Sequence, residues 1–364
     1  DILPEVRDYE RGRATWLNAS VGPVISNYLQ RLQTRLPKAG IAVMQSAGTT
    51  IAADQAAHQA VRLLLSGPAG GLAAARSLGQ QAGTPRLMSF DMGGTSTDVA
   101  LLNGDIPLTS QSRISNWPLS SPSVDIHTIG AGGGSIARVD PAGMLLVGPE
   151  SAGASPGPVC YDQGGKQLTV TDANVVLGRI PANTLLGGYL PLDAQAAQEA
   201  MEKLAVDMGC DVLEAAHGVV RLANEHMARA LRVISVERGY DPADYALLCF
   251  GGAGGLHACD LARLLNMQRI IIPARSGVLS AVGMLVSEPG RELSSAVLKP
   301  LDSLTDEDIQ REFNVLETEA AAQLAAEGYM ARDVHFRHQL ELRYKGQNAT
   351  IPVAVSYTHL RAHD

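Results

Sequence analysis

The segment FDMGGTSTDVALL, residues 90–102, restricts the possible folds of this chain most strongly. A short apolar run, RLMSF, leads into Asp91, two glycines, a hydroxyl-rich turn and a second acid, Asp98. Glycines let a backbone approach a ligand closely, and the hydroxyl and N–H groups of such a turn can hold phosphate oxygens. The pattern predicts two strands joined by a phosphate-binding turn. The alternative is a tight β-hairpin in which glycine serves only the turn.

Polyphosphate chemistry needs donors at the oxygens, a divalent cation that neutralises charge, and a carboxylate that holds the cation's waters or aligns the attacking group. We predict that Asp91 is this carboxylate, that it holds Mg²⁺, and that Asp98 is the second catalytic acid. The predicted nucleotide-binding residues of the turn are Gly93, Gly94, Thr95 and Ser96.

A second glycine-rich segment, CFGGAGGLHACDLA, covers residues 249–262. YALLCF before it and QRIIIPA after it are apolar, so the order strand, glycine loop, helix and parallel strand is predicted. CFGGAGGLHACDLA resembles the adenosine motif of the actin, hexokinase and heat-shock chaperone superfamily, which implies that its glycines lie against a base and ribose. Alternatively, they simply allow close packing of strand and helix. His257 can likewise contact a ribose or serve a structural role. The predicted nucleotide contacts are Gly251, Gly252, Gly254, Gly255 and His257.

The segment DIHTIGAGGGSIA is the third candidate. Asp125 and His127 lie on one face if the chain is extended, and they are predicted catalytic residues that bind metal or substrate or act as acid and base. A structural role is the alternative, because one Asp-x-His pair is too small for a zinc site. Gly132 to Ser135 form either an anion loop or a mobile turn. Cys160 has no fixed base nearby in the sequence, which argues against a nucleophile.

The remaining pattern is that of an α/β domain. Apolar spacing predicts a helix over 16–36, and Gly67 to Gly71 are predicted as a loop before the helix LAAARSLG. Asn103-Gly104 predicts a hairpin that returns through IPLTS. Residues 126–165 are predicted as ordered loops. Three more helices are expected, one capped by Asp193, one capped by Asp211 and ending at Gly239, and one over 312–327 before a terminal strand.

Composition excludes several classes of protein. The net charge of −8 argues against nucleic-acid binding, and no apolar run is long enough to cross a membrane. Four cysteines without CxxC spacing are typical of reduced thiols, so a cytoplasmic protein is expected.

The domain prediction has three parts. Residues 1–333 are assigned to one large α/β domain, 334–355 to the start of a C-terminal β region, and 356–364 to a non-native tail that resembles translated adapter sequence. Because the chain starts at Asp1 in sequence typical of a protein's middle, we expect a missing N-terminal lobe.

Several stretches together resemble the hydantoinase A / 5-oxoprolinase family, which includes N-methylhydantoinase A and is similar to the acetone carboxylase beta subunit. They are ERGRATWLNASVGPVISNYLQRL, LLSGPAGG, FDMGGTSTDVALL, DIHTIGAGGGSIA, GPESAGASPGPVCYDQGG, VTDANVVLGRI, SVERGYDPADYALLCFGGAGGLHACDLA and LELRYKGQ. DMGGTSTD also resembles the phosphate loops of the actin, hexokinase and heat-shock chaperone superfamily. The resemblance implies an α/β actin-like (ribonuclease H-like) ATPase domain with a mixed sheet and flanking helices.

The resemblance also implies an activity. Family members use ATP, with Mg²⁺, to phosphorylate the amide oxygen of a hydantoin or 5-oxoproline, so that water opens the ring. They commonly work with a second large subunit of the hydantoinase B type. Two alternatives stay open: an ATP-binding subunit of an acetone- or acetophenone-type carboxylase, and a non-catalytic module that contributes half a nucleotide cleft.

Overall fold

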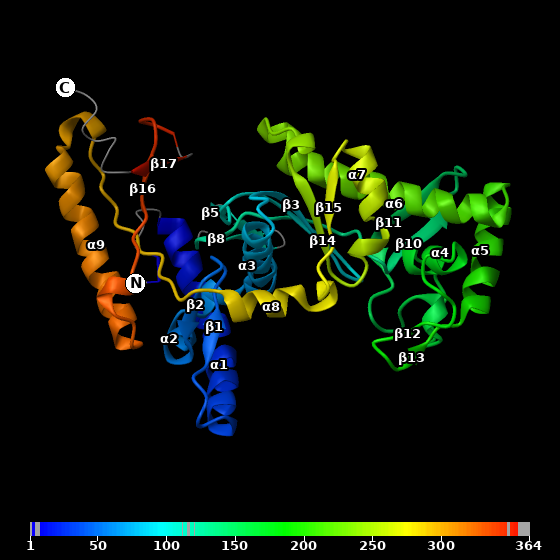
Figure 1. The fold of residues 1–364 in the computed structure, drawn as a ribbon, viewed down its shortest axis with the longest axis horizontal. Coiled ribbons are helices and arrows are strands. Elements are labelled where there is room, and N and C mark those ends of the chain that lie inside the picture. The colour runs from blue at the N-terminus through cyan, green and yellow to red at the C-terminus, as the bar shows by residue number, and fades with distance from the viewer. Residues whose placement is uncertain are drawn as a thin grey trace.

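The computed structural model describes residues 2–3, 8–110, 112–114, 117–119, 121–347 and 350–355. The predicted non-native tail, 356–364, lies outside these residues. Figure 1 shows a central sheet, with one helical and β-rich region at each end of the molecule. Within the described ranges, no helix is long and apolar enough to cross a membrane.

A five-stranded mixed sheet organises the molecule. Its order is β15-β14-β3-β4-β9, in which β14 runs parallel to both β3 and β15, and β4 runs antiparallel to β3 and β9. The strands are β3 (Arg86–Met92), β4 (Thr97–Asn103), β9 (His127–Ile129), β14 (Ala246–Phe250) and β15 (Arg269–Ile271). The two predicted strands joined by the glycine turn after Asp91 and the predicted parallel crossover are therefore confirmed.

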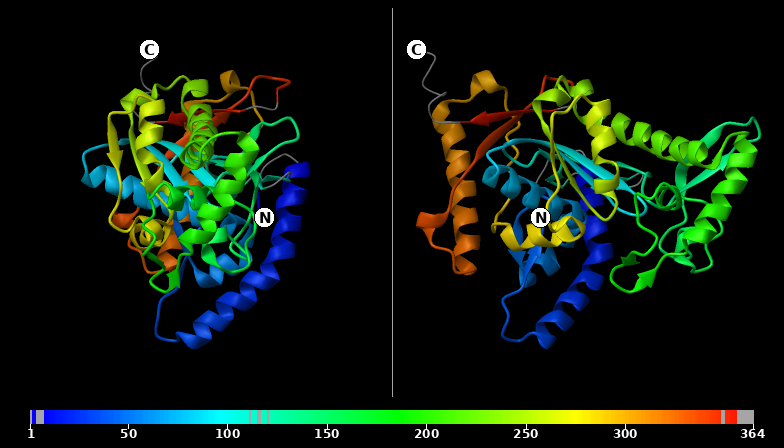
Figure 2. Two further views of the ribbon diagram at one scale, coloured as in Figure 1. Left: turned by 90° about the vertical axis from the view of Figure 1, so that its right-hand side faces the viewer. Right: turned by 45° about the vertical axis from the view of Figure 1, so that its right-hand side comes forward.

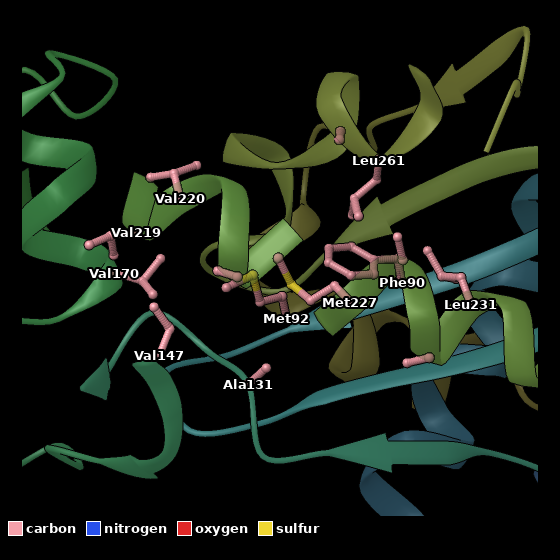
Figure 3. Close-up of a cluster of buried hydrophobic side chains, with 14 of the residues drawn as sticks. Phe90, Met92, Ala131, Val147, Val170, Val219, Val220, Met227, Leu231 and Leu261 are labelled. Atoms are coloured by element: carbon pink, nitrogen blue, oxygen red, sulfur yellow. The ribbon is translucent and has the colours of Figure 1, made fainter. Parts of the chain in front are cut away.

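Side chains of the sheet alternate between two cores, as the two-residue period of a strand requires. On β3, Phe90 and Met92 belong to the larger core, whereas Leu87 belongs to the core on the opposite face. Figure 3 shows Phe90 and Met92 against Met227 and Leu231 of α6 (Val212–Ile234). Helices thus cover both faces of the sheet.

The capped helices form as predicted. Asp193 accepts a hydrogen bond from the backbone of α5 (Ala194–Met208), and Asp211 does the same for α6. The apolar positions of α6 are buried against the sheet. However, α6 ends at Ile234, and a 3-10 turn, η3 (Val236–Arg238), separates it from Gly239, which has φ 82°. The other helices of this half are α4 (Val170–Val176) and α7 (Ala258–Leu264).

The predicted loop from Gly67 to Gly71 is wrong, because these residues lie inside α3 (Ser66–Gln81). Gly70 and Gly71 pack against Ser280 of α8 (Leu279–Val286). A Cβ on Gly70 would lie 2.6 Å from the carbonyl oxygen of Ser280, and one on Gly283 would lie 1.7 Å from the carbonyl oxygen of Gly70. Close helix contact therefore outweighs the low helix propensity of glycine.

The hairpin predicted at Asn103-Gly104 is also wrong. The return segment, β5 (Leu108–Thr109), pairs with β8 (Ser123–Val124), and β9 occupies the sheet position next to β4. The glycine-dense region 126–165 is not all loop, since it contains the antiparallel pair β10 (Ser135–Val139) and β11 (Leu145–Ser151). Gly104 keeps a left-handed φ of 90°, so the turn forms without the hairpin.

The helix predicted over 16–36 is α1 (Asp8–Arg35), which begins earlier, with Asp8 and Glu10 in its first turn where acids are favourable. Figure 2 shows α1 along the outside of the molecule. The last predicted helix is α9 (Asp306–Ala326), which begins earlier because Thr305 caps it. The terminal strand region forms a hairpin of β16 (His338–Leu342) and β17 (Ile351–Val355).

The short elements complete the chain. They are β1 (Ala42–Met44), β2 (Thr50–Ala52), α2 (Ala53–His58), η1 (Ala60–Leu63), β6 (Ser112–Ile114), β7 (Trp117–Leu119), η2 (Val159–Tyr161), β12 (Leu185–Leu186), β13 (Leu190–Pro191), η4 (Pro242–Asp244), η5 (Gly254–Leu256), η6 (Ser276–Val278), η7 (Leu301–Ser303) and η8 (Ala331–Asp333).

Candidate functional site

Two carboxylates mark the end of the β3–β4 hairpin. Asp91 and Asp98 are direct cross-strand partners, and the turn 93–96 follows them. The turn closes with a hydrogen bond from the Gly93 N–H to the Ser96 carbonyl, 3.0 Å long. Asp98 Oδ1 accepts a hydrogen bond from Thr128 Oγ1 on β9 at 2.5 Å. The strand pairing therefore brings the two predicted acids together beside the predicted phosphate turn.

The electrostatics of this pair favour proton or cation binding. Burial, together with the charge of Asp98, raises the pKa of Asp91 to about 6. Burial also raises the pKa of Asp98, although the Thr128 hydrogen bond opposes this by stabilising its charged form. Like charges placed opposite each other on a sheet are unfavourable. A divalent cation beside them would offset that repulsion.

The second glycine segment lies next to this hairpin because β14 is parallel to β3 and places Phe250 opposite Asp91. Gly251 follows with φ 78°, and a Cβ there would lie 2.5 Å from Asp91 Oδ1. The Ala253 N–H donates to the Met92 carbonyl at 3.1 Å. The two predicted glycine loops, far apart in sequence, thus leave neighbouring strands at the same edge of the sheet.

The loop 130–135 packs its backbone on the turn of the hairpin. The Gly133 N–H donates to the Gly93 carbonyl at 3.1 Å, and the Gly134 N–H donates to the Gly94 carbonyl at 2.7 Å. A Cβ on Gly132 would lie 2.7 Å from the carbonyl carbon and oxygen of Gly94. This loop is therefore ordered by backbone contacts that only glycine permits, and the mobile-turn alternative is not supported.

Several other glycines face open space. A Cβ on Gly94, Gly252 or Gly255 would meet nothing within 4 Å, and none of the three has a left-handed φ. All three are exposed. Neither backbone conformation nor a neighbouring atom therefore requires glycine there. A ligand that approaches the backbone would require it.

The predicted residues Asp125 and His127 have different neighbours in the structure. Both carboxylate oxygens of Asp125 bind Arg238, which follows α6, at 2.5 and 3.3 Å. His127 opposes Val99 on the β4–β9 ladder, whereas Thr128 opposes and contacts Asp98. Across the described residues, His, Cys, Asp and Glu side chains form no group of three or more that could hold a metal.

His257 is completely buried, and its Nδ1 lies 2.6 Å from Asn224 Oδ1 on α6. Burial, helped by the nearby Arg179 charge, lowers the pKa of His257 to about 4, so the ring is neutral at pH 7. Within the described chain, its buried Nε2 has no hydrogen-bond partner. These contacts favour the structural alternative for His257. Its predicted ribose contact stays a prediction.

Cys160 is an unfavourable nucleophile in this structure. The side chain is fully buried, and burial together with the charge of Asp172 raises the pKa of its thiol far above the ordinary value. A thiolate is the reactive form of cysteine, so a raised pKa suppresses reactivity.

Sequence reasoning missed two residues that hold the loops. Asn224 binds His257, and Thr171, at the start of α4, binds the carbonyl of Gly133 through both its N–H and its hydroxyl at 2.8 Å. The available signal for Asn224 was a polar residue inside the apolar stripe of a helix. Thr171 lies within VTDANVV without a comparable signal.

Comparison with known proteins gives a consistent result. The profile of the hydantoinase/oxoprolinase family matches residues 11–292. The chain is 37% identical to 5-oxoprolinase 1 of Arabidopsis thaliana, covering 97% of this chain and 29% of that protein. It is 35% identical to caprolactamase subunit alpha of Pseudomonas jessenii, covering 99% of this chain and 53% of the relative.

Two solved structures share the fold. The crystal structure of ATP-dependent caprolactamase from Pseudomonas jessenii matches with a TM-score of 0.87 and 34% identity, over 97% of this chain and 52% of that one. Nucleotide-free acetone carboxylase matches with a TM-score of 0.75 and 28% identity, over 94% of this chain and 50% of that one. The predicted actin-like ATPase type of fold is thereby confirmed. The chain spans about half the length of both solved relatives.

Proposed function

Because the chain belongs to the hydantoinase/oxoprolinase family, we propose that it binds ATP for the opening of a cyclic amide such as a hydantoin or 5-oxoproline. The γ-phosphoryl group passes from ATP to the amide oxygen, water attacks the activated carbon, the C–N bond breaks, and ADP and phosphate leave. The observation that carries this proposal is the opposed pair Asp91 and Asp98 beside glycine backbone that faces open space.

The chain offers several groups that suit the phosphate end of ATP. In the turn 93–96, Gly94 and Thr95 are exposed and offer N–H and hydroxyl groups, and the loop 130–135 holds the Gly93 and Gly94 carbonyls through backbone hydrogen bonds. The open backbone at Gly252 and Gly255 suits a ribose and base. These features support the predicted nucleotide contacts of both glycine segments.

The carboxylate oxygens of Asp91 and Asp98 are suitable ligands for Mg²⁺. Mg²⁺ keeps several waters and binds through one or two carboxylates plus substrate phosphates, so a larger protein cage is unnecessary. Asp91 would hold the ion, and Asp98 would orient its waters or the attacking group. When bound, the ion neutralises charge that develops on the phosphates.

Two further assignments follow from the named relatives. One curated relative is a subunit by name, caprolactamase subunit alpha, which supports a partner subunit of the hydantoinase B type. The fold match to acetone carboxylase supports the second candidate function, in which ATP serves carboxylation of a ketone. Both functions share phosphorylation at an oxygen and need the same nucleotide-side residues.

Calorimetry of ATP binding in the presence of Mg²⁺ tests the proposal. We expect Asp91→Asn to weaken MgATP binding about tenfold, because a charge-assisted contact is lost. Asp207→Asn, an exposed acid on α5, is the matched control and should bind as the parent does. Absence of ATP binding by the parent chain would contradict the proposal and favour the non-catalytic module.

The substrate class is tested by phosphate release. The parent chain, with and without the partner subunit, would be assayed against a hydantoin, 5-oxoproline, and a ketone with bicarbonate. Release that depends on a cyclic amide supports the leading function, whereas release that depends on ketone and bicarbonate supports the carboxylase.

A further inference from the structure

Helix α4 begins at the loop that backs the phosphate turn. Thr171, in its first turn, donates from both N–H and Oγ1 to the Gly133 carbonyl at 2.8 Å. Gly133 in turn donates to the carbonyl of Gly93 in the hairpin turn. One end of α4 is therefore connected to the phosphate side of the site by two consecutive contacts.

The other end of α4 leads to the adenosine-side turn. Arg179 follows the helix, and its backbone N–H bonds to the Asn174 carbonyl at 2.9 Å. Its guanidinium donates to the Leu256 carbonyl at 3.2 Å and to Asp260 Oδ2 at 3.1 Å. Leu256 ends η5, which starts at Gly254. Arg179 thus ties the end of α4 to the turn that carries the second glycine segment.

The attachment to that turn is reinforced from α6. The Asn224 side-chain NH₂ donates a hydrogen bond to Asp260 Oδ2 at 3.2 Å, and Asn224 Oδ1 lies 2.6 Å from the buried His257 Nδ1. Because an amide oxygen can only accept, Nδ1–H of the neutral His257 is assigned as the donor of this hydrogen bond. Asp260 is therefore held by two elements at once, and the contact with Arg179 has a fixed partner.

Helix α4 is short and firmly seated. Seven residues of α-helix span about 10 Å. Asp172 is fully buried and accepts hydrogen bonds from the N–H groups of Thr169 and Cys160, both at 2.8 Å. Because α4 is short and is anchored by these bonds at its start, we expect a displacement at one end to be transmitted to the other.

We propose that α4 is a strut that sets the spacing between the phosphate-side loop at Gly133 and the adenosine-side turn at Leu256, with Thr171 and Arg179 as positioning residues. The identity of the ligand rests on the proposed function. The strut itself rests on contacts at both ends of the helix. Misplacement of a bound group by about 1 Å can cost on the order of 100-fold in rate, so such spacing has consequences.

The ligand test is a double-mutant cycle on MgATP affinity, measured by calorimetry with the full chain. Thr171→Val removes the hydroxyl contact, and Arg179→Gln removes the charged one. We expect each to weaken binding about fivefold to tenfold. The double variant should be no weaker than the worse single variant, because a strut whose attachment is weakened at either end no longer sets the spacing. Losses that multiply would overturn the proposal.

Two matched controls separate positioning from general damage. Arg263→Gln removes a second cation from the same carboxylate, Asp260 Oδ1, and should leave MgATP affinity unchanged. Thr171→Ser retains the hydroxyl and should restore binding. Inorganic tripolyphosphate, which lacks the adenosine part, should lose affinity with Thr171→Val and also with Arg179→Gln, because the strut transmits the loss of the Arg179 contact to the phosphate-side loop.

A ligand-free arm tests the strut independently of ATP. Amide hydrogen exchange at Gly133 and Gly134 should become several-fold faster in Arg179→Gln, although Arg179 contacts neither residue, and should be unchanged in Arg263→Gln. If the faster amide exchange in Arg179→Gln is confined to the turn 254–257, the proposed coupling through α4 is contradicted. If the parent chain does not bind ATP but exchange is coupled, the proposed function fails and the strut stands.

Discussion

Asp91 and Asp98 face each other across the β3–β4 hairpin, and the charge of Asp98 adds to burial in raising the pKa of Asp91 to about 6. Above about pH 6 the Asp91 carboxylate is therefore ionised at a cost to the folded state. Under the proposed function, a divalent cation beside the pair would offset that cost.

This arrangement predicts a pH-dependent gain in stability for Asp91→Asn. The pKa of Asp91 is raised in the folded state, so its contribution to stability falls as pH rises from about 4 to about 6. Removing the charge should stabilise the chain at pH 7.5 by about 1 kcal/mol after allowance for solvent screening, and by nothing at pH 4. Urea unfolding measures this. Asp207→Asn is the control, and an equal gain at both pH values would contradict the explanation.

The buried His257 predicts sensitivity to acid. Its folded pKa of about 4 lies below the ordinary value of 6.5, so stability is present above pH 6.5 and is lost as pH falls towards 4. The loss should approach about 3 kcal/mol. In His257→Gln the free energy of unfolding should fall less as the pH is lowered through this range. His217→Gln, on an exposed position of α6, should retain the full acid loss, measured by urea unfolding from pH 7 to 4.5.

The substitution Gly252→Ala distinguishes an effect on ligand binding from an effect on folding. Because a Cβ there meets nothing within 4 Å, Gly252→Ala should change the free energy of unfolding by less than about 1 kcal/mol. MgATP affinity should fall about tenfold if the ligand lies on this backbone. Gly277→Ala, equally uncrowded, is the control for both measurements. Unchanged affinity in Gly252→Ala would remove this residue from the nucleotide site.

The contact between α3 and α8 predicts a large loss of stability for Gly283→Ala. The new Cβ would overlap the Gly70 carbonyl, so the helices must separate, at a cost of about 3 kcal/mol or more. Gly22→Ala, in α1 with nothing within 4 Å, should instead stabilise by up to about 1 kcal/mol. Thermal unfolding distinguishes the two. A neutral Gly283→Ala would show that the helices can separate freely.

The ion pair of Asp125 and Arg238 allows a test of the predicted catalytic role of Asp125. If the ion pair only holds the two segments together, Asp125→Asn and Arg238→Gln should reduce the ATP-dependent activity by similar factors. The double variant should then be no less active than either single variant. Stability changes should stay below about 1 kcal/mol, because both side chains are partly exposed. A much larger loss of activity for Asp125→Asn alone would support the catalytic role.

Local signals predicted much of the fold. The Asp211 cap and the apolar stripe of α6, the strand before Asp91, and the parallel crossover through β15 each depend on residues close in sequence. The errors arose where partners lie far apart. Gly70 is helical because Gly283 packs against it, and the turn at Gly104 makes no hairpin because β5 pairs with β8.

The site residues divide in the same way into local and distant signals. The turn after Asp91 is recognisable from its own residues. The contact between Asn224 on α6 and His257, just before α7, spans 33 positions, and no periodic sequence pattern indicates it. The pairing of Asp125 with Arg238 was equally inaccessible, since neither neighbourhood specifies the other.

The parallel pairing of β3 with β14 joins Asp91 and Phe250, which are roughly 160 positions apart, and so places the two glycine loops at neighbouring strand ends through the strand register. Parts of the intervening chain that contact neither loop can change length or composition without altering that placement, provided that the ladder is kept. Surfaces built from the intervening residues are therefore free to diverge while the edge of the sheet stays the same. A sheet edge of this kind can be kept by relatives that differ in the molecules on which they act.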